Sequence, residues 1–367
     1  MVEHLIAFAT SHYLLVGAFV ILLALLIAHE MSRGGRSIST GELTGLVNRD
    51  EGVVIDIRPV KDFAAGHIVG ALNIPQDKLM ARIAELERQA TAAAAAAQAT
   101  AQELDETRRA RLAAQLGPGG IAIIPTAPER QRNRDNSYLY RHDSYFFYLT
   151  GFTEPGATLV LTAEGRATLF CQPKDIEREI WDGYRLGPQA APAALGLDAA
   201  YANTEIDAHL PPLLDNQQCV WWPFATHDGL AAQIERWLTP VRQRARAGVL
   251  CPAQQGDLCQ LLDEMRLIKD PHELATLRRA ATISASAHMR AMQTSARMLR
   301  AGEDVREYHL DAELLHAFRH HGAQGVAYDS IVAAGANACV LHYRAGNTPV
   351  RDGDLVLIDA GCELDGY

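Results

Sequence analysis

Residues 353–367 read GDLVLIDAGCELDGY, and this stretch decides the fold prediction for the carboxyl-terminal part of the chain. Four apolar residues, 355–358, lie between Gly353 and Gly361, which is the pattern of a short strand buried on both faces. Such a strand ends at Asp359 and places this carboxylate at the rim of a sheet. A metal site is expected to begin at this position.

The composition is that of a globular protein. The chain has 367 residues, of which 48% are apolar and 21% charged, so two or three domains with a sizeable core are expected. The net charge of −10, without a concentrated basic run, argues against binding to nucleic acid. The six cysteines show no CxxC spacing, which favours reduced thiols in a cytosolic setting.

The amino-terminal residues 1–36 are predicted to be a transmembrane anchor. The apolar run from Leu5 to Ala28 has the length needed to cross a bilayer. No lysine or arginine precedes the run and no small-residue cleavage site follows it, which favours an anchor over a cleaved signal peptide. Arg33 and Arg36 follow it, so the positive-inside rule predicts a single-pass protein of the inner membrane with the bulk of the chain in the cytoplasm.

Residues 37–88 resemble the front half of a rhodanese-like domain. The resemblance rests on the strand-like VVIDIR at 53–58 and on DFAAGHIVGALNIP at 62–75. The sulfur transfer of that family needs a thiolate cysteine, and the first cysteine of this chain is Cys171. We therefore expect a partial α/β segment without catalysis. Three of its polar residues are expected to order a turn and a helix end: Asp56, Arg58 and His67.

Residues 89–116 are predicted to be an alanine-rich helical linker. Six consecutive alanines, 92–97, lie in a run without glycine or proline, where helix propensity is high. Because the apolar side is mostly alanine, a solvated or loosely packed helix is expected. The GPGG sequence at 117–120 ends it.

Two further domains are predicted. Residues 117–262 alternate strand-like runs, such as 157–161 and 167–170, with helical segments, which indicates an α/β domain. Residues 263–367 contain Asp270-Pro271-His272-Glu273, a capping box at the start of a long helix, and are expected to be α+β. The run 338–343 is strand-like and carries His342.

Several motifs, taken together in their order, resemble the aminopeptidase P family, the Xaa-Pro aminopeptidases. The resemblance extends over residues 104–367. The motifs are RNRDNSY (132–138), YLTGFTEP (148–155), EIWDGYRLG (179–187), EMRLIK (264–269), CVLHY (339–343) and the opening stretch.

The resemblance implies an aminopeptidase P N-terminal α/β domain and an incomplete pita-bread catalytic domain. Family members use two divalent metal ions, usually manganese, to hydrolyse the bond before a proline in the second position of a peptide. Asp359 matches the first aspartate of the metal set. A second aspartate, a histidine and two glutamates are implied beyond Tyr367, so the chain is expected to be truncated, to hold the ions poorly and to be inactive.

The resemblance also assigns roles to three other residues. His342 matches a histidine close to substrate, and Asp135 and Trp181 match residues that reach the active site of a neighbouring subunit in a homo-oligomer. From the residues alone, other roles stay open. Asp135 can cap a turn, Trp181 can belong to a core, and His342 can be satisfied within a sheet.

Three functions are therefore considered. The first is an Xaa-Pro aminopeptidase family protein that is inactive as this chain. The second is a non-catalytic, membrane-anchored interaction protein that uses the domain at 117–262. The third, a rhodanese-like sulfurtransferase, has the least support because the segment lacks the cysteine nucleophile.

Overall fold

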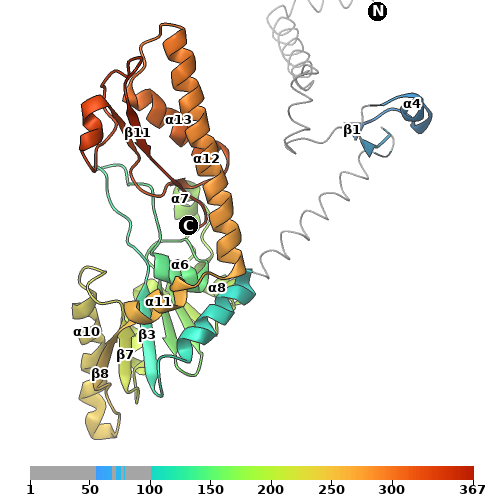
Figure 1. The fold of residues 1–367 in the computed structure, drawn as a ribbon. Helices are drawn as coiled ribbons and strands as arrows, with labels where there is room; N and C mark the ends of the chain where they lie inside the picture. Colours follow the sequence, from blue (N-terminus) through green and yellow to red (C-terminus); the bar gives the residue numbers. More distant parts are fainter. Residues whose placement is uncertain (1–54, 68–71, 76–77, 79–100) are drawn as a thin grey trace, which may run out of the picture. The chain divides into compact units, whose positions relative to one another are not determined.

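The computed structural model describes residues 55–67, 72–75, 78 and 101–367, in two compact units divided between Ala95 and Ala96 (Figure 1). Among these residues, no helix is both long and apolar enough to cross a membrane. The predicted anchor at 5–28 and the alanine run at 92–97 lie outside the described residues.

The described part of the first unit is a small α/β arrangement. Strand β1 (Ile55–Asp56) pairs in parallel with β2 (Leu72–Asn73), and α4 (Val60–Ala65) lies between them in the sequence. The Asp56 carboxylate accepts hydrogen bonds from the backbone and guanidinium of Arg58, which lower the pKa of Asp56 to about 2. His67 Nδ1 donates to the carbonyl of Phe63 at 2.9 Å. The predicted turn and helix-end roles are confirmed.

The second unit begins with a mixed six-stranded sheet in the order β6-β5-β4-β3-β7-β8. The pairs β3–β4 and β4–β5 are antiparallel, whereas β5–β6, β3–β7 and β7–β8 are parallel. The predicted strands at 157–161 and 167–170 are confirmed as β4 and β5. The strands are β3 (Gly120–Pro125), β4 (Thr158–Thr162), β5 (Ala167–Cys171), β6 (Ala199–Ala202), β7 (Cys219–Trp222) and β8 (Gln254–Asp257).

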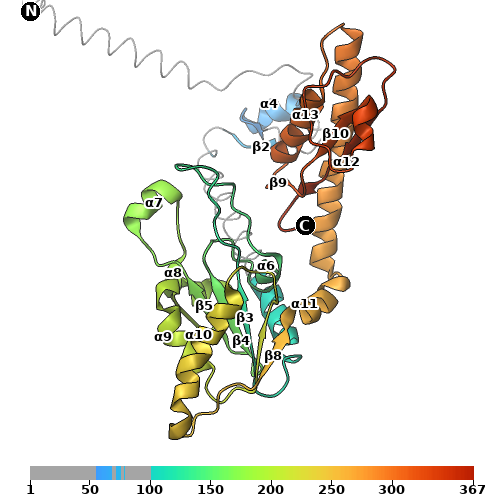
Figure 2. The ribbon, with the colours of Figure 1, turned by 90° about the vertical axis from the view of Figure 1, so that its left-hand side faces the viewer.

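Helices cover both faces of this sheet (Figure 2). One apolar cluster joins Ala122 and Ile124 of β3 to the helix at 101–113, α6 (Ser144–Thr150), α8 (Gly187–Leu195) and α11 (Leu258–Leu267). A second cluster joins Ile121 and Ile123 to α9 (Ile206–Leu213) and α10 (Leu230–Gln243). Neighbouring residues of a strand face opposite sides, so β3 is apolar throughout. Short helices complete this part: α7 (Ile176–Asp182), η1 (Asn203–Glu205) and η2 (Arg244–Ala247).

The prediction of a solvated linker helix is wrong for its last turns. Leu112 and Leu116 belong to the first apolar cluster, and Arg108 and Arg109 are buried. The Arg109 guanidinium donates to the carbonyls of Leu149, Leu195 and Gly196 at 2.8–2.9 Å. Leu149 and Leu195 lie in the last turns of α6 and α8, and Gly196 follows α8. Backbone carbonyls at the end of a helix have no partner within the helix. The buried arginine supplies that partner.

The carboxyl-terminal part packs two long helices against two strand pairs (Figure 1). The predicted capping box is confirmed, because the Asp270 side chain accepts from the Glu273 amide and the Glu273 side chain accepts from the Asp270 amide, both at 2.8 Å. Strand β10 pairs antiparallel with β11, and β9 with β12. The elements are α12 (Pro271–Arg300), α13 (Glu307–His320), β9 (Gly325–Val326), β10 (Ile331–Ala334), η3 (Gly335–Cys339), β11 (Val356–Asp359) and β12 (Cys362–Glu363).

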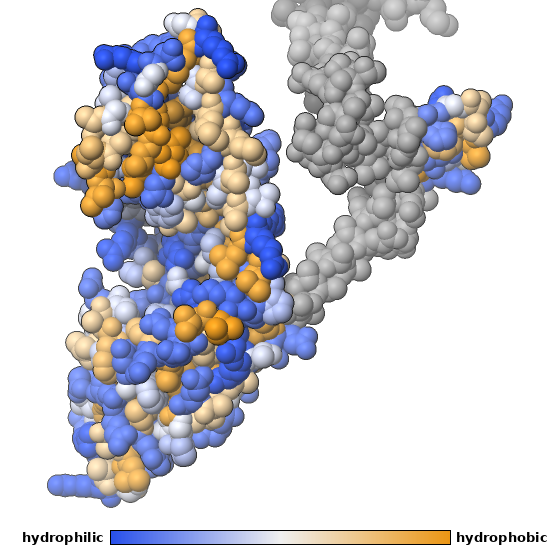
Figure 3. Space-filling model, viewed as in Figure 1, coloured by the Kyte–Doolittle hydropathy of each residue, from blue (hydrophilic) through white to orange (hydrophobic). Residues whose placement is uncertain are grey.

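Strand β11 forms as predicted, but the prediction that it is buried on both faces is wrong. Val356 and Ile358 pack against the cluster that α12 and α13 build, whereas Leu355 is 83% exposed and Leu357 41%. Figure 3 shows hydrophobic side chains gathered on the surface over β11. In the described part of the chain, β11 belongs to a two-stranded sheet whose helices cover one face. The second face therefore has no covering layer there.

Candidate functional site

Asp359 is the last residue of β11 and lies opposite Ile331 of β10. Its exposed carboxylate accepts a hydrogen bond from the Tyr328 hydroxyl, with 2.6 Å between Oη and Oδ1. This bond and partial burial raise the pKa of Tyr328 to about 12, since loss of the hydroxyl proton would place two negative charges side by side. The strand-end position of Asp359 is as expected, and its role as a metal ligand stays a prediction.

His342 does not lie in a strand, so this part of the prediction is wrong. Residues 335–339 form the short helix η3, and His342 follows in an exposed turn. The next residue, Tyr343, donates its hydroxyl proton to the buried Glu307 carboxylate at 2.8 Å. A hydrogen-bonding anchor far away in the sequence thus competes with the local preference for a strand.

Asp135 and Trp181 lie on exposed elements of the amino-terminal half of this unit. The Asn133 side chain accepts from the amides of Asp135 and Asn136 at 3.0 and 2.8 Å, which orders the turn and leaves the Asp135 carboxylate exposed. Trp181 lies on α7 and is 84% exposed, so it does not belong to a core in this chain. The substrate-binding roles of both residues stay predictions.

The described residues do not fit a two-metal centre. Among them, no three histidine, cysteine, aspartate or glutamate side chains are arranged to hold a metal ion. Of the five ligands that the family resemblance implies, Asp359 alone has a matching position in the sequence. His316 and His320 are exposed on α13, and their rings stack on each other with 5.6 Å between the centroids.

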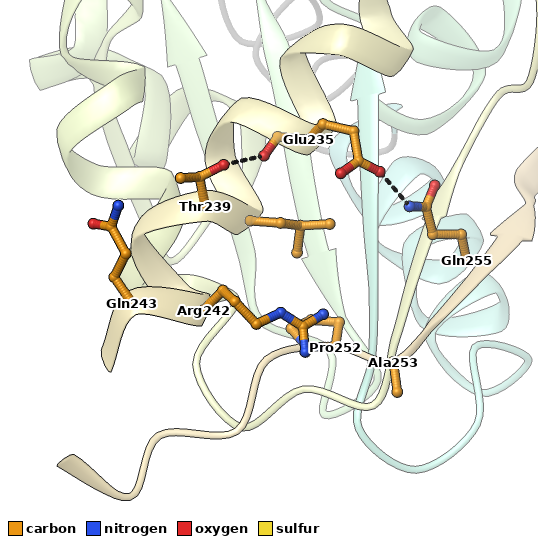
Figure 4. Close-up of a pocket in the computed structure, with 8 residues that line it drawn as sticks. Glu235, Thr239, Arg242, Gln243, Pro252, Ala253 and Gln255 are labelled. Carbon is orange, nitrogen blue, oxygen red and sulfur yellow. Dashed lines mark hydrogen bonds between the residues drawn. The ribbon is translucent and has the colours of Figure 1, made fainter. Parts of the chain in front are cut away.

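Two of the cavities in the described part of the chain are lined by neither Asp359 nor His342. One, of about 830 Å³, is lined by residues of both halves of the unit, among them Phe147 and Val326, and the Arg141–Glu363 ion pair of 2.9 Å joins these halves. The other, of about 350 Å³, lies between α10 and the segment before β8 (Figure 4). There the Gln255 amide donates to Glu235 at 3.2 Å. Neither cavity contains the predicted site residues.

Two residues that contact the candidate site were not predicted from the sequence: Glu307 and Tyr328. Glu307 is an acidic residue in the first turn of a helix, where negative charge is common, so the pattern gives no sign that it is fully buried. Tyr328 lies in a bend before β10, and nothing in the sequence indicates its bond to Asp359.

Comparison with known proteins shows three matched ranges. Residues 39–112 match the rhodanese-like domain, residues 106–221 match the aminopeptidase P N-terminal domain, and residues 275–367 match metallopeptidase family M24. The first two ranges overlap in the helix at 101–113, whose last turns pack into the six-stranded domain.

Relatives and solved structures agree with these matches. The chain is 42% identical over 266 residues to the Xaa-Pro aminopeptidase of Escherichia coli strain K12, covering 71% of this chain and 59% of that protein. It is 31% identical over 262 residues to human Xaa-Pro aminopeptidase 3, covering 69% and 49%.

A structure of the Pseudomonas aeruginosa aminopeptidase PepP matches with a TM-score of 0.67 at 44% identity, covering 71% of this chain and 58% of that one. Zn-substituted E. coli aminopeptidase P in complex with product matches with a TM-score of 0.68 at 41% identity, covering 72% and 60%. The chain thus spans about three fifths of these two structures. Over its aminopeptidase P N-terminal and M24 ranges, the chain belongs to the Xaa-Pro aminopeptidase family.

Proposed function

We propose that this protein functions in the metal-dependent hydrolysis of peptides that carry proline in the second position, by cleavage of the bond before that proline. The observation that carries the proposal is the position of Asp359, which lies at the end of β11 within the range that matches family M24 and accepts a hydrogen bond from Tyr328. The likeness to proteins named Xaa-Pro aminopeptidase supports the substrate class.

In this proposal, Asp359 is a ligand of a divalent ion and His342 lies beside the substrate. A neutral imidazole there can donate a hydrogen bond to the substrate carbonyl or carry a proton. Because the described residues do not fit a two-metal centre, we assign no step of the reaction to the ions. That the 367 residues alone hold the metal poorly and are inactive stays a prediction, as does manganese as the metal.

Peptide hydrolysis by two preparations tests this function. Antibodies against residues 121–252 would isolate the protein from its source cells, and the 367-residue chain would be produced separately; both would receive Mn²⁺ and an Xaa-Pro tripeptide. We expect release of the first amino acid by the native protein, loss of that release with a chelator, and none from the 367-residue chain. Release by both preparations would contradict the prediction of inactivity, and no release by the native protein would overturn the function.

The matched control for this assay is protein isolated in the same way from source cells whose gene carries Asp359→Asn. The change keeps the shape of the side chain and removes its negative charge, so any metal-dependent release should fall to background in the variant. Release that survives this substitution would show that Asp359 is not a ligand.

The homo-oligomer that we propose with this function is supported by the surface of α7 and the residues after it. Four large apolar residues there are 71–84% exposed: Ile176, Ile180, Trp181 and Tyr184. Large exposed apolar residues that gather in one short segment are typical of an interaction site. We propose that a second copy of the chain covers it, which agrees with the predicted homo-oligomer and with the predicted reach of Asp135 and Trp181 into a neighbouring subunit.

Analytical ultracentrifugation in detergent tests this association. Changing Ile180 and Trp181 to serine should convert an oligomer to monomers, since neither side chain contributes to a core. The matched control is Leu355→Ser, an equally exposed apolar residue away from α7, which should leave the assembly intact. A monomeric unaltered chain would overturn the homo-oligomer proposal.

The proposed location is the inner membrane, with a single pass and the remainder of the chain in the cytoplasm. The proposal is supported by the apolar run at 5–28 and by the arginines that follow it. Alkaline carbonate extraction should leave the chain in the membrane pellet, and deletion of residues 1–36 should release it. Extraction of the unaltered chain would contradict the proposal.

A further inference from the structure

The side chain of Glu307 is the most completely bonded acidic group at the candidate site. It is the first residue of α13 and has no exposed surface. Oε1 accepts from the Ala334 amide at 2.8 Å and from Asn337 Nδ2 at 2.9 Å. Oε2 accepts from the Tyr343 hydroxyl at 2.8 Å and from the Gly346 amide at 3.1 Å. All four donors of these bonds come from residues far away in the sequence.

These partners lie on both sides of His342 in the sequence. Ala334 and Asn337 precede it at the end of β10 and in η3, whereas Tyr343 and Gly346 follow it. Ala334 also pairs with Val356 of β11, the strand that ends at Asp359. One carboxylate therefore fastens both ends of the turn that carries His342 to the strand pair that carries Asp359.

The same turn has further bonds to the residues around Glu307. The Glu307 amide donates to the Thr348 carbonyl at 3.2 Å, and Asn337 Nδ2 also donates to Thr348 Oγ1 at 3.0 Å. The Arg306 guanidinium donates to the Asn347 carbonyl at 2.8 Å. The segment is thus closed against the start of α13 through both backbone and side chains.

The ionised form of Glu307 is the one that suits this arrangement. Burial alone would raise its pKa, but the hydrogen bonds from Asn337, Ala334, Tyr343 and Gly346 outweigh burial and leave the pKa below its ordinary value. A carboxylate only accepts hydrogen bonds, so four donors can converge on it. A neutral amide in its place would direct an NH₂ group at one of the two backbone amides.

We propose that Glu307 is a positioning residue that fixes the turn carrying His342 relative to the strand pair that ends at Asp359. The inference rests on the proposed function, in which His342 lies beside the substrate. Glu307 acts through the four hydrogen bonds and touches neither substrate nor metal. It determines where the imidazole stands, and thereby how closely it approaches the reacting carbonyl.

Backbone order at His342 tests the proposal without any need for activity. The full chain in detergent would be labelled with [¹⁵N]histidine, and the His342 amide assigned by its loss in His342→Gln. We expect an order parameter near 0.85, the value of a rigid backbone, in the unaltered chain, and a fall below about 0.6 in Glu307→Gln. The His288 amide within α12 is the internal reference and should not change.

Two further variants keep this test decisive. Tyr343→Phe removes one donor to Glu307 and retains the ring, so it should lower the order at His342 even if Glu307→Gln does not fold. Glu313→Gln makes the same chemical change on α13 at an ion pair with Arg290 and should leave His342 as it was. An unchanged His342 amide in folded Tyr343→Phe and in any folded Glu307→Gln would overturn the proposal, because a purely global effect on stability leaves local order intact.

Kinetics separate this inference from the proposed function. In a preparation that hydrolyses Xaa-Pro peptides, Glu307→Gln should lower kcat on the order of 10²-fold with KM little changed, as expected for a misplaced group. An equal fall in all variants, Glu313→Gln included, would contradict it. If no preparation hydrolyses the peptides, the proposed function fails, while the order at His342 still decides the role of Glu307.

Discussion

Strands β3 and β11 have similar apolar sequences but different surroundings. In β3, the four residues at 121–124 have no exposed surface, whereas residues 355–359 of the β11 stretch alternate between exposed and half-buried. Both faces of β3 are covered by helices, and in the described residues only one face of β11 is. The comparison shows that the number of covering layers, which a strand sequence does not state, decides how much of an apolar strand is buried.

The two regions also differ in how they hold their parts together. The sheet of β3 is enclosed by two apolar clusters. The strand pair of β11 packs against one apolar cluster and is in addition fastened by a buried carboxylate, Glu307, with four hydrogen bonds. Apolar layers tolerate changes that preserve volume. A buried carboxylate with four donors does not tolerate the loss of any of these hydrogen bonds, because each buried donor that is left unpaired costs free energy.

The largest expected effect is that of removing an apolar side chain from β3. Ile123→Ala should lower the free energy of unfolding by about 2–5 kcal/mol, because the side chain is fully buried and leaves a cavity. Leu355→Ala, at the start of the β11 stretch, should change it by less than about 0.5 kcal/mol, since that side chain is 83% exposed. Urea unfolding measures both, and equal losses would contradict the comparison.

A smaller effect is expected from Asp105, a buried carboxyl of the sheet region. Burial raises its pKa to about 7, and its contact with Arg108 is long, with 3.7 Å between Oδ1 and Nη1. Because the folded-state pKa lies above the ordinary value of 3.8, its contribution to stability is complete below about pH 4 and is lost as the pH rises through 7. A rise of three pKa units corresponds to a loss of at most about 4 kcal/mol at pH 8.

Asp105→Asn should remove this pH dependence, so that the free energy of unfolding falls less between pH 5 and pH 8 than in the unaltered chain. Thermal or urea unfolding at the two pH values measures the difference. Asp182→Asn, at an exposed carboxylate, is the control and should leave the dependence unchanged. If Asp105→Asn shows the same pH dependence of unfolding as this control, the Asp105 carboxylate is ionised in the folded chain. The sheet region then has no buried neutral carboxyl group to compare with the ionised Glu307.

A further effect, of about 1–3 kcal/mol, is expected at Gly151, which ends α6 beside Asp105. Its φ of 60° is a left-handed conformation that costs alanine about 1–2 kcal/mol, and an added Cβ would lie 2.8 Å from Asp105 Oδ2. Gly165→Ala is matched in conformation, with φ of 87°, but meets no atom within 4 Å. Gly151→Ala should therefore destabilise the chain more than Gly165→Ala in urea unfolding. Equal losses would show that the side chain of Asp105 moves aside freely.

Local features were predictable from the sequence where neighbouring residues determine them. The capping box of Asp270 and Glu273 needs residues three apart, and it formed as expected. Strands β4 and β5 follow from short apolar runs, and they too are present. The strand-end position of Asp359 belongs to the same class, since it depends on a run that ends at a polar residue.

Features that depend on distant partners were not predictable. The run at 338–343 has the composition of a strand, but Glu307, about 30 residues earlier, collects its hydrogen bonds and shapes it into η3 and a turn. The helix at 101–113 resembled a solvated linker because it follows an alanine run and because arginine side chains are usually exposed. The Arg109 guanidinium is nevertheless buried against carbonyls from three later residues. Neither the donors to Glu307 nor the carbonyls around Arg109 can be identified from residues that are neighbours in the sequence.

The smallest expected effect concerns α7, the exception within the sheet region, since none of its residues is buried. Asp175 caps this helix by accepting from the amides of Glu177 and Arg178 at 3.0 and 3.1 Å. Asp175→Ala should weaken α7 by about 1 kcal/mol and speed hydrogen exchange at its amides, while exchange in β3 and the global free energy of unfolding stay the same. Asp175→Asn retains a capping side chain and should exchange like the unaltered chain. If Asp175→Ala lowers the global free energy of unfolding instead, α7 is coupled to the sheet despite its exposure. The number of covering layers alone then does not determine which elements are stable.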